Sequence, residues 1–186
     1  MPWLNLAGLP PKTYTCGWCG KVIATASGFQ TQANLPNVQF VYICPFCDKP
    51  TIFEEKGQTP GVAPGVEVTH LPPDIETMYR EARNCVAIAS YTSAVLSCRK
   101  LLMHVAVAQG APVGESFVEY VDHLATAGFV PPNGRGWVDH IRKKGNEANH
   151  EIRLMTQSDA EDLISFAEML LKFIYEFPRR VPGAVP

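Results

Sequence analysis

Two cysteine pairs, each with two residues between its members, constrain the fold of this chain more than any other feature. They are Cys16-Gly17-Trp18-Cys19 and Cys44-Pro45-Phe46-Cys47, with residues 20–43 between them. Each pair places two thiolates on a tight turn, so the two pairs together supply a closed tetrahedral set of ligands for one ion. We therefore predict a zinc ribbon in which Cys16, Cys19, Cys44 and Cys47 hold a structural Zn²⁺ ion.

Other uses of these cysteines are two disulfides or four free thiols. Residues 1–6 lack the basic segment and apolar core of a secretory signal, so we expect a cytoplasmic location, where disulfides are rare. A catalytic zinc ion keeps one position open for water or substrate, and four sulfur ligands leave none. The pattern therefore favours a structural ion.

The residues around the cysteines are typical of short strands. Residues 12–53 are rich in Thr, Val, Ile, Tyr and Phe and are interrupted by Gly, Asn and Pro, and residues 38–43 are the clearest strand. We assign residues 1–53 to the zinc ribbon. A unit of this size has little core of its own, so we expect metal binding to supply most of its folding free energy.

The rest of the chain changes in character at a proline-rich stretch. Residues 54–73 contain four prolines and are read as a linker, followed by residues 74–178 with apolar positions at helical spacing. The predicted helices cover residues 74–89, 90–109, 116–127, a segment starting near 137, and 158–177. We expect Ser158 to cap the last of these helices and Pro178 to end it, and Cys98 of the second helix to be an inert core residue. The fold class is therefore α+β: a small β zinc ribbon, an antiparallel bundle of about five helices, and a tail at 179–186.

The predicted fourth helix carries the most suggestive polar residues. Arg142, Asn146 and His150 are spaced four apart and share one face, with Lys144 nearby. His150 is a candidate general acid or base, and Arg142 or Lys144 could hold a phosphate. Gly145 costs about 1 kcal/mol relative to Ala in a helix interior, which suggests close approach by another helix. In the alternative interpretation, these polar groups bond to the backbone or form a solvated surface.

Several segments of residues 74–177 form a recurring combination: Tyr79-Arg80-Glu81-Ala82, Tyr91, Arg99, Gly128-Phe129-Val130-Pro131 and Gly145-Asn146-Glu147-Ala148-Asn149-His150. Together they resemble a bacterial domain of unknown function found beside type I restriction subunits and in defence-associated proteins. That domain is similar to the HEPN superfamily of helical bundles. The resemblance implies a helical bundle that acts in a nucleic-acid-linked process.

Many HEPN proteins are metal-independent ribonucleases, usually dimeric, in which four to six residues stand between an Arg and a His. In this chain Gly145 is the residue with four residues between it and His150, Lys144 has five, and Arg142 has seven. If RNA were cleaved, the resemblance implies that His150 would move the proton and Asn146 would orient it. Lys144 or Arg142 would then stabilise the charged transition state.

Charge and hydropathy narrow the classes of partner. The net charge is −2 and the pI is near 6.2, so any nucleic-acid site must be local rather than spread over the surface. Apolar stretches such as residues 87–96 are shorter than the ~20 residues of a membrane span. Trp18 and Phe46 could stack on bases, although packing inside the protein is the commoner role of such residues.

The sequence thus predicts a non-catalytic binding or regulatory module in a nucleic-acid-linked, defence-type process, with RNA or protein as its partner. The first alternative is a metal-independent HEPN-type ribonuclease that uses His150 and Asn146. The second is a structural subunit that dimerises through the bundle. We also expect a homodimer, because Gly145 and the small residues near it suit close helix contact, and no association with membranes.

Overall fold

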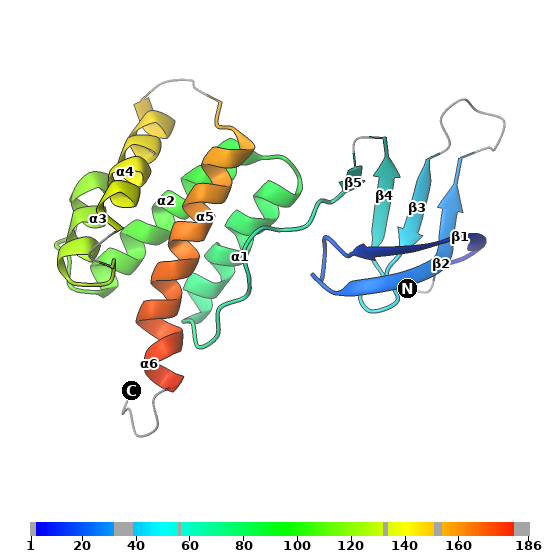
Figure 1. Cartoon of the computed structure of the whole chain (residues 1–186), viewed down its shortest axis with the longest axis horizontal. Helices are drawn as coiled ribbons and strands as arrows, with labels where there is room; N and C mark the ends of the chain where they lie inside the picture. Colours follow the sequence, from blue (N-terminus) through cyan, green and yellow to red (C-terminus); the bar gives the residue numbers. More distant parts are fainter. Residues whose placement is uncertain (1–2, 32–38, 56, 132–133, 151–153, 181–186) are drawn as a thin grey trace. The chain divides into compact units, whose positions relative to one another are not determined.

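The computed structural model describes residues 3–31, 39–55, 57–131, 134–150 and 154–180, apart from the side chains of residue 135 and residues 144–150. The chain divides into two compact units, Met1–Ala63 and Pro64–Pro186, of which the first is β-rich and the second helical (Figure 1). The predicted α+β fold class is confirmed. None of the described helices combines the length and apolarity that a bilayer crossing requires.

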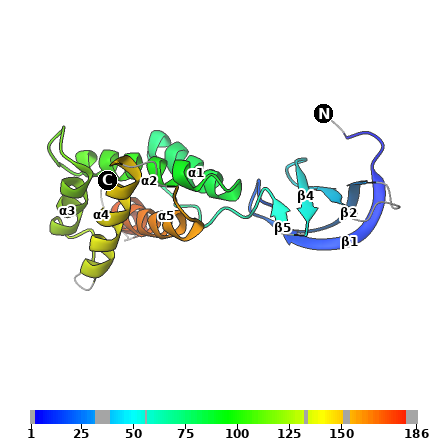
Figure 2. The same ribbon diagram turned by 90° about the horizontal axis from the view of Figure 1, so that it is seen from above.

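The first unit is a five-stranded antiparallel sheet in which the strands follow one another in chain order. The strands are β1 (Ala7–Thr15), β2 (Val22–Gln30), β3 (Phe40–Ile43), β4 (Pro50–Glu54) and β5 (Gly57–Thr59). The pairing of β1 with β2 shifts register between Gly8 and Lys12, and the pair is strongly curved (Figure 2). A β-bulge of this kind bends the strand that carries it.

The core of the sheet is small and aromatic. Its buried side chains include Leu9, Tyr14, Ile23 and Tyr42. The rings of Tyr14 and Tyr42 contact Phe53 edge-on, with centroids 4.9 and 5.6 Å apart. Because so few apolar side chains are buried, this unit depends on a further source of stability.

The second unit contains five principal helices. They are α1 (Pro73–Ala87), α2 (Tyr91–Ala108), α3 (Phe117–Thr126), α4 (Arg135–His150) and α5 (Gln157–Leu171), which continues through the π-helical turn η2 (Lys172–Glu176) into α6 (Phe177–Arg180). Helix α2 contacts α1, α3, α4 and α5, so it forms the centre of the bundle. Accordingly it buries residues all along its length, from Ala94 to Ala106.

Two helix ends differ from the sequence prediction. Helix α5 is capped by Thr156 rather than Ser158, because the Thr156 hydroxyl accepts from the Asp159 N–H while the Asp159 carboxylate accepts from the Thr156 N–H. Its C-terminal continuation passes Pro178 instead of ending there. The π-helical turn shifts the hydrogen-bond register just before Pro178, which then lies in the first turn of α6, where a missing N–H costs little.

The sequence suggested a linker at residues 54–73. Within this range, residues 57–59 form β5 of the sheet, and residues 64–71, here called the strap, pack on the helices. Val68 of the strap is buried in the core of the bundle. The Tyr79 hydroxyl donates to the Val66 carbonyl (3.0 Å), and the Val66 N–H donates to the Glu168 carboxylate (3.0 Å).

Two further side chains hold the strap at its ends. Arg83 donates from Nε to the Pro64 carbonyl (2.7 Å) and from Nη2 to the Gly65 carbonyl (3.0 Å). Glu176 accepts from the Thr69 N–H (3.0 Å). Backbone groups of the strap are thus satisfied by side chains of α1, α5 and η2 rather than by a regular element.

Candidate metal centre

The first cysteine pair lies on the turn between β1 and β2. The Cys16 N–H donates to the Lys21 carbonyl (2.9 Å), and the Gly20 N–H donates to the Cys16 carbonyl (2.8 Å). Gly20 adopts φ of +68°, a left-handed conformation that glycine reaches without strain. This closed turn, here called the first knuckle, aims both sulfur atoms to the same side.

The second cysteine pair forms a turn of the same design between β3 and β4. The Cys44 N–H donates to the Lys49 carbonyl (3.1 Å), and the Asp48 N–H donates to the Cys44 carbonyl (3.0 Å). Asp48 stands where the first knuckle has glycine and also takes a positive φ, +54°. Asp tolerates this region better than most residues, so the second knuckle keeps the same backbone path without glycine.

The two knuckles bring four sulfur atoms together. The Sγ atoms of Cys16, Cys19, Cys44 and Cys47 all lie within 4.8 Å of one another, and the Cys16–Cys47 and Cys19–Cys44 separations are both 3.8 Å. A tetrahedral site with metal–sulfur distances of about 2.3 Å requires sulfur atoms about 3.8 Å apart, whereas a disulfide requires about 2.05 Å. All four cysteines are free thiols in this structure, so the cluster fits a bound metal ion rather than disulfides.

Burial makes two of the four thiols, those of Cys19 and Cys47, weaker acids than a free cysteine. Burial raises the pKa of the Cys19 thiol and raises that of Cys47 to about 12. Burial acts in the same sense at Cys44, but hydrogen bonds from the backbone N–H groups of Phe46 and Cys47 outweigh it and lower that pKa. Four neighbouring thiolates repel one another, so a cation is needed to keep all of them charged.

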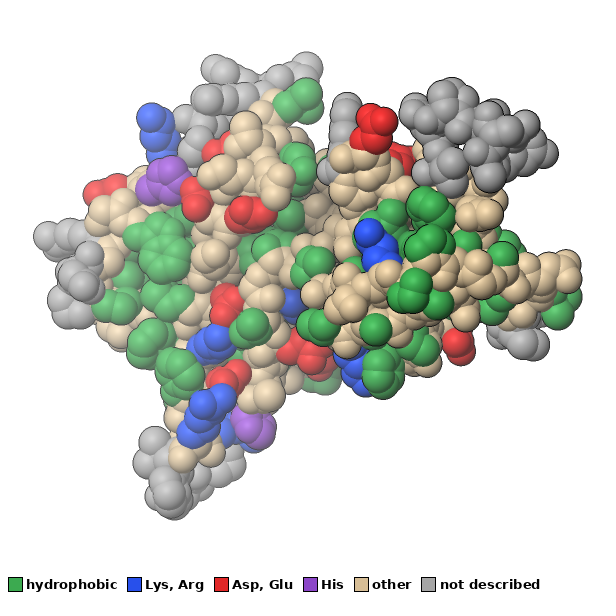
Figure 3. All heavy atoms as spheres, turned by 45° about the vertical axis from the view of Figure 1, so that its right-hand side comes forward, with side chains coloured by type: hydrophobic (Ala, Val, Ile, Leu, Met, Phe, Trp, Pro, Cys, Tyr) green, Lys and Arg blue, Asp and Glu red, His purple; other side chains and the backbone are tan. Residues whose placement is uncertain are grey.

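The aromatic residue of each knuckle is exposed, contrary to the packing that the sequence favoured. The residues Trp18 and Phe46 are 48% and 63% exposed. The core beneath is already filled by Tyr14, Tyr42 and Phe53, which leaves no buried place for them. In the space-filling view the β-rich unit shows exposed hydrophobic side chains next to isolated lysines (Figure 3).

Each exposed ring is paired with a lysine of the other knuckle. Lys49 Nζ lies 4.7 Å from the centroid of Trp18, and Lys21 Nζ lies 4.4 Å from the centroid of Phe46. The Trp18 indole N–H donates to the Pro50 carbonyl (2.7 Å), which fixes the plane of its ring. We call Trp18, Lys21, Phe46 and Lys49 the knuckle face.

The polar residues predicted on the fourth helix lie on α4, but only one of their side chains is described. The side chains of Lys144, Asn146 and His150 fall outside the described residues. Arg142 is described, and its guanidinium forms ion pairs with Asp122 of α3 (3.3 Å) and with Asp139 one turn earlier (3.1 Å).

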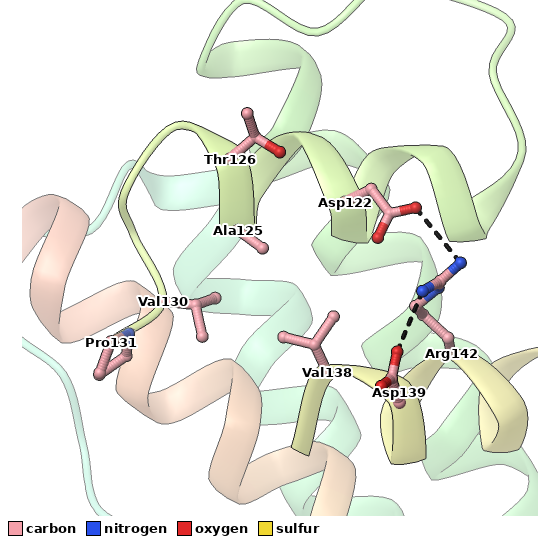
Figure 4. A pocket seen from close by; sticks show the side chains of 8 residues that line it. All are labelled: Asp122, Ala125, Thr126, Val130, Pro131, Val138, Asp139 and Arg142. Carbon is pink, nitrogen blue, oxygen red and sulfur yellow. Dashed lines mark hydrogen bonds and ion pairs between the residues drawn. The ribbon is translucent and has the colours of Figure 1, made fainter. Parts of the chain in front are cut away.

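Arg142 borders an open hollow of about 840 Å³ between α3 and α4 (Figure 4). The hollow is lined by Asp122, Ala125, Thr126, Val130, Pro131, Val138, Asp139 and Arg142. Two carboxylates engage the single guanidinium, so the charge at this wall is negative overall. An incoming phosphate would have to displace both carboxylates and would be repelled by them.

Neither ion-pair partner of Arg142 was predicted from the sequence. Asp139 stands at i,i+3 from Arg142, a spacing that often yields an ion pair on a helix and could have signalled this contact. Asp122 comes from a different helix, and its approach depends on how α3 packs against α4, for which the sequence holds no local signal.

A family model described as a domain of unknown function (DUF4145) matches residues 80–184, which is more than half of the chain. The match covers the helices from within α1 onward and does not include the metal centre. No curated protein and no solved structure matches the chain. The expected resemblance to a domain of unknown function is confirmed to this extent, and the chain belongs to the DUF4145 family.

Proposed function

We propose that this protein is a non-catalytic binding module whose N-terminal unit is a zinc ribbon. The observation that carries the proposal is the cluster of four sulfur atoms, whose separations are those required for tetrahedral coordination of one ion. Four thiolates form a soft ligand set that suits Zn²⁺ and other thiophilic ions and does not suit Mg²⁺ or Ca²⁺. Zinc bound by four cysteines supplies folding free energy and no open position for a substrate.

The described residues support binding more than catalysis. Among them, the four cysteines form the only group of three or more His, Cys, Asp or Glu side chains close enough to share a metal ion. Arg142, a candidate for phosphate stabilisation, already pairs with two carboxylates. For Arg142 to stabilise a transition state, its guanidinium would first have to leave Asp122 and Asp139, whose carboxylates would then repel the substrate phosphate.

The proposed ligand is nucleic acid, in a defence-type or regulatory process. The knuckle face offers two exposed aromatic rings and two lysines within the metal-supported unit. These two lysines supply the ammonium groups through which a chain of net charge −2 would contact phosphate. The helical unit is proposed to be HEPN-like, on the strength of the Gly145–His150 segment and the bundle architecture.

The first experiment measures metal content. Chain purified without chelators should contain one zinc per chain by elemental analysis, and Cys44→Ser should lose it. The matched control is Cys85→Ser, which removes a partly exposed thiol on α1 outside the cluster and should leave the zinc in place. Metal-free wild-type protein, or disulfides within the cluster, would refute the zinc ribbon.

The second experiment measures binding and cleavage together. Labelled RNA and DNA, each as single strand and duplex, are incubated with the full chain at several salt concentrations. Binding that weakens as salt rises, with the RNA left intact, is expected from phosphate contacts without catalysis. RNA cleavage that disappears in His150→Ala would reject the non-catalytic proposal in favour of a ribonuclease.

A homodimer is also proposed, from the helix contact that Gly145 suggests in the sequence. Light scattering on the purified chain should give a mass of about twice 20.5 kDa. A single-chain mass at high protein concentration would rule the dimer out.

A further inference from the structure

We propose that the knuckle face binds single-stranded nucleic acid, with bases stacked on Trp18 and Phe46 and phosphates paired with Lys21 and Lys49. This inference rests on the proposed function and deepens it, because it assigns the binding surface and the form of the nucleic acid. The four residues occupy equivalent positions in the two knuckles: the aromatic residue is third and the lysine is sixth, counted from the first cysteine.

The two rings are available and at least one is held in place. Trp18 and Phe46 are 48% and 63% exposed, more than aromatic residues normally are in a folded domain. The hydrogen bond from the Trp18 indole to the Pro50 carbonyl orients the larger ring. A preorganised ring loses little conformational entropy when a base stacks on it.

Each lysine lies next to one of the rings on which a base would stack. Each ammonium group is 4.4–4.7 Å from the centroid of a ring in the opposite knuckle, so charge and aromatic surface alternate across the face. Within the described part of the chain neither Lys21 nor Lys49 forms an ion pair with a carboxylate. Both ammonium groups are therefore free to turn from the ring to a phosphate.

The charge of the metal centre limits how strongly this surface attracts phosphate. Four thiolates and one divalent cation carry a net charge of −2, which the two knuckle lysines offset locally. Asp48 is the one acidic residue in residues 16–49, the range that contains both knuckles. With about two phosphate contacts, the logarithm of the affinity should fall with the logarithm of salt concentration at a slope of about −1.4.

Single strands fit this face better than duplexes. In a duplex the bases are stacked on one another and only their edges face the grooves, so the two rings would have nothing to stack on. Two lysines alone would hold a duplex weakly. Stacking on rings is tolerant of sequence, and little base preference is expected.

The test uses the full zinc-loaded chain and fluorescently labelled 12-nucleotide single strands of DNA and RNA, with the matching duplexes. Fluorescence anisotropy should show tighter binding of the single strands. Trp18→Leu and Phe46→Leu keep apolar bulk but remove the aromatic face, and each should weaken single-strand binding about 5- to 150-fold. Trp18→Phe should recover most of that loss.

Lysine variants separate phosphate contacts from general charge. Lys21→Gln and Lys49→Gln should each reduce the magnitude of the salt slope by about 0.7. The matched control is Lys12→Gln, which removes a lysine that lies 4.3 Å from the centroid of Phe53 on another part of the same unit. This control should leave both affinity and slope unchanged. Zinc content, measured for every variant, confirms that the ribbon is folded.

Each outcome decides between the two proposals. Nucleic acid that binds with the same affinity to zinc-loaded Trp18→Leu and Phe46→Leu would overturn the knuckle-face inference and leave the proposed function standing. Equal affinity for duplex and single strand would do the same. Absence of binding to every nucleic acid tested would overturn both, and would point to a protein partner for this surface.

Discussion

The carboxylate of Glu176, in the π-helical turn after α5, accepts a hydrogen bond of 3.0 Å from the backbone N–H of Thr69 in the strap. Glu176 is only 4% exposed, and it also pairs with Arg180 one turn later. The hydrogen bond from Thr69 is the main reason why the pKa of this carboxyl is lowered, since it favours the charged form. The strap is therefore held at this end by a group whose charge depends on pH.

Glu176→Gln should lower the melting temperature at neutral pH, because the amide gives up the charged acceptor. A carboxyl whose pKa is lower in the folded state stabilises the protein above its unfolded pKa, about 4.3, and loses that contribution as the pH falls through the folded value. The difference between wild type and variant should thus be constant from pH 6 to 8 and shrink below pH 4. Thermal unfolding followed at several pH values measures it.

Glu161→Gln is the control for this experiment. Glu161 lies on α5, and its carboxylate accepts a hydrogen bond from exposed Gln157 (2.7 Å) rather than from the strap. The Glu161→Gln substitution should change the melting temperature little at every pH. A Glu176→Gln variant as stable as Glu161→Gln at neutral pH would show that the strap does not depend on this carboxylate.

Gly65→Ala should destabilise the helical unit by about 2–3 kcal/mol. Gly65 has φ of +69°, and an added Cβ would lie 2.6 Å from Glu168 Oε2 and 3.0 Å from the Tyr79 hydroxyl oxygen. Both oxygens hold the strap, so neither can move away without losing a hydrogen bond. Urea unfolding measures the change.

Gly114→Ala isolates the backbone part of that effect. Gly114 also has a positive φ, +96°, but an added Cβ there meets no atom within 4 Å. This variant should cost about 1–2 kcal/mol, the usual penalty of a left-handed conformation. If both variants lose equal stability, the close approach at Gly65 contributes nothing.

Removal of the metal should unfold the ribbon and spare the bundle. The core of the helical unit consists of residues from Val68 onward, and it does not include the cysteine cluster. A strong chelator should therefore change the fluorescence of Trp18 and Trp3, while the helical signal in circular dichroism at 222 nm remains. Zinc added back should restore the fluorescence. Loss of both signals together would mean that the bundle also requires the ion.

Arg142→Met should have little effect on stability or on nucleic-acid binding. The guanidinium is one-third exposed and its carboxylate partners are more exposed, so each ion pair is worth about 0–1 kcal/mol. A double-mutant cycle with Asp122→Asn measures the coupling. A large loss of nucleic-acid affinity in Arg142→Met would show that Arg142 leaves its carboxylates to contact the ligand.

The metal centre could be predicted from the sequence because the residues that form each knuckle are neighbours in the chain. Two residues between paired cysteines fix each knuckle, and the five-stranded sheet between and beyond them brings the knuckles together. Helical spacing located the bundle in the same way. Cys98, expected to be an inert core residue, is indeed buried, and burial raises the pKa of its thiol to about 12.

The features that could not be predicted from the sequence depend on contacts between residues that lie far apart in the chain. Residues 64–71 lack a helical or strand pattern, and their order comes from side chains such as Glu168, about a hundred residues later. The exposure of Trp18 and Phe46 follows from a core already filled by other aromatic rings. Pro178 was expected to end a helix, and only the preceding π-helical turn allows the chain to continue through it.

The strap also determines where the helical unit can be cut for separate expression. A fragment that starts at Arg80, where the family match begins, would discard Val68, Ile75 and Tyr79 from the core. It would leave the carboxylates of Glu168 and Glu176 without the backbone donors that they hold. A fragment that starts at Pro64 retains these contacts and should remain monodisperse and crystallise.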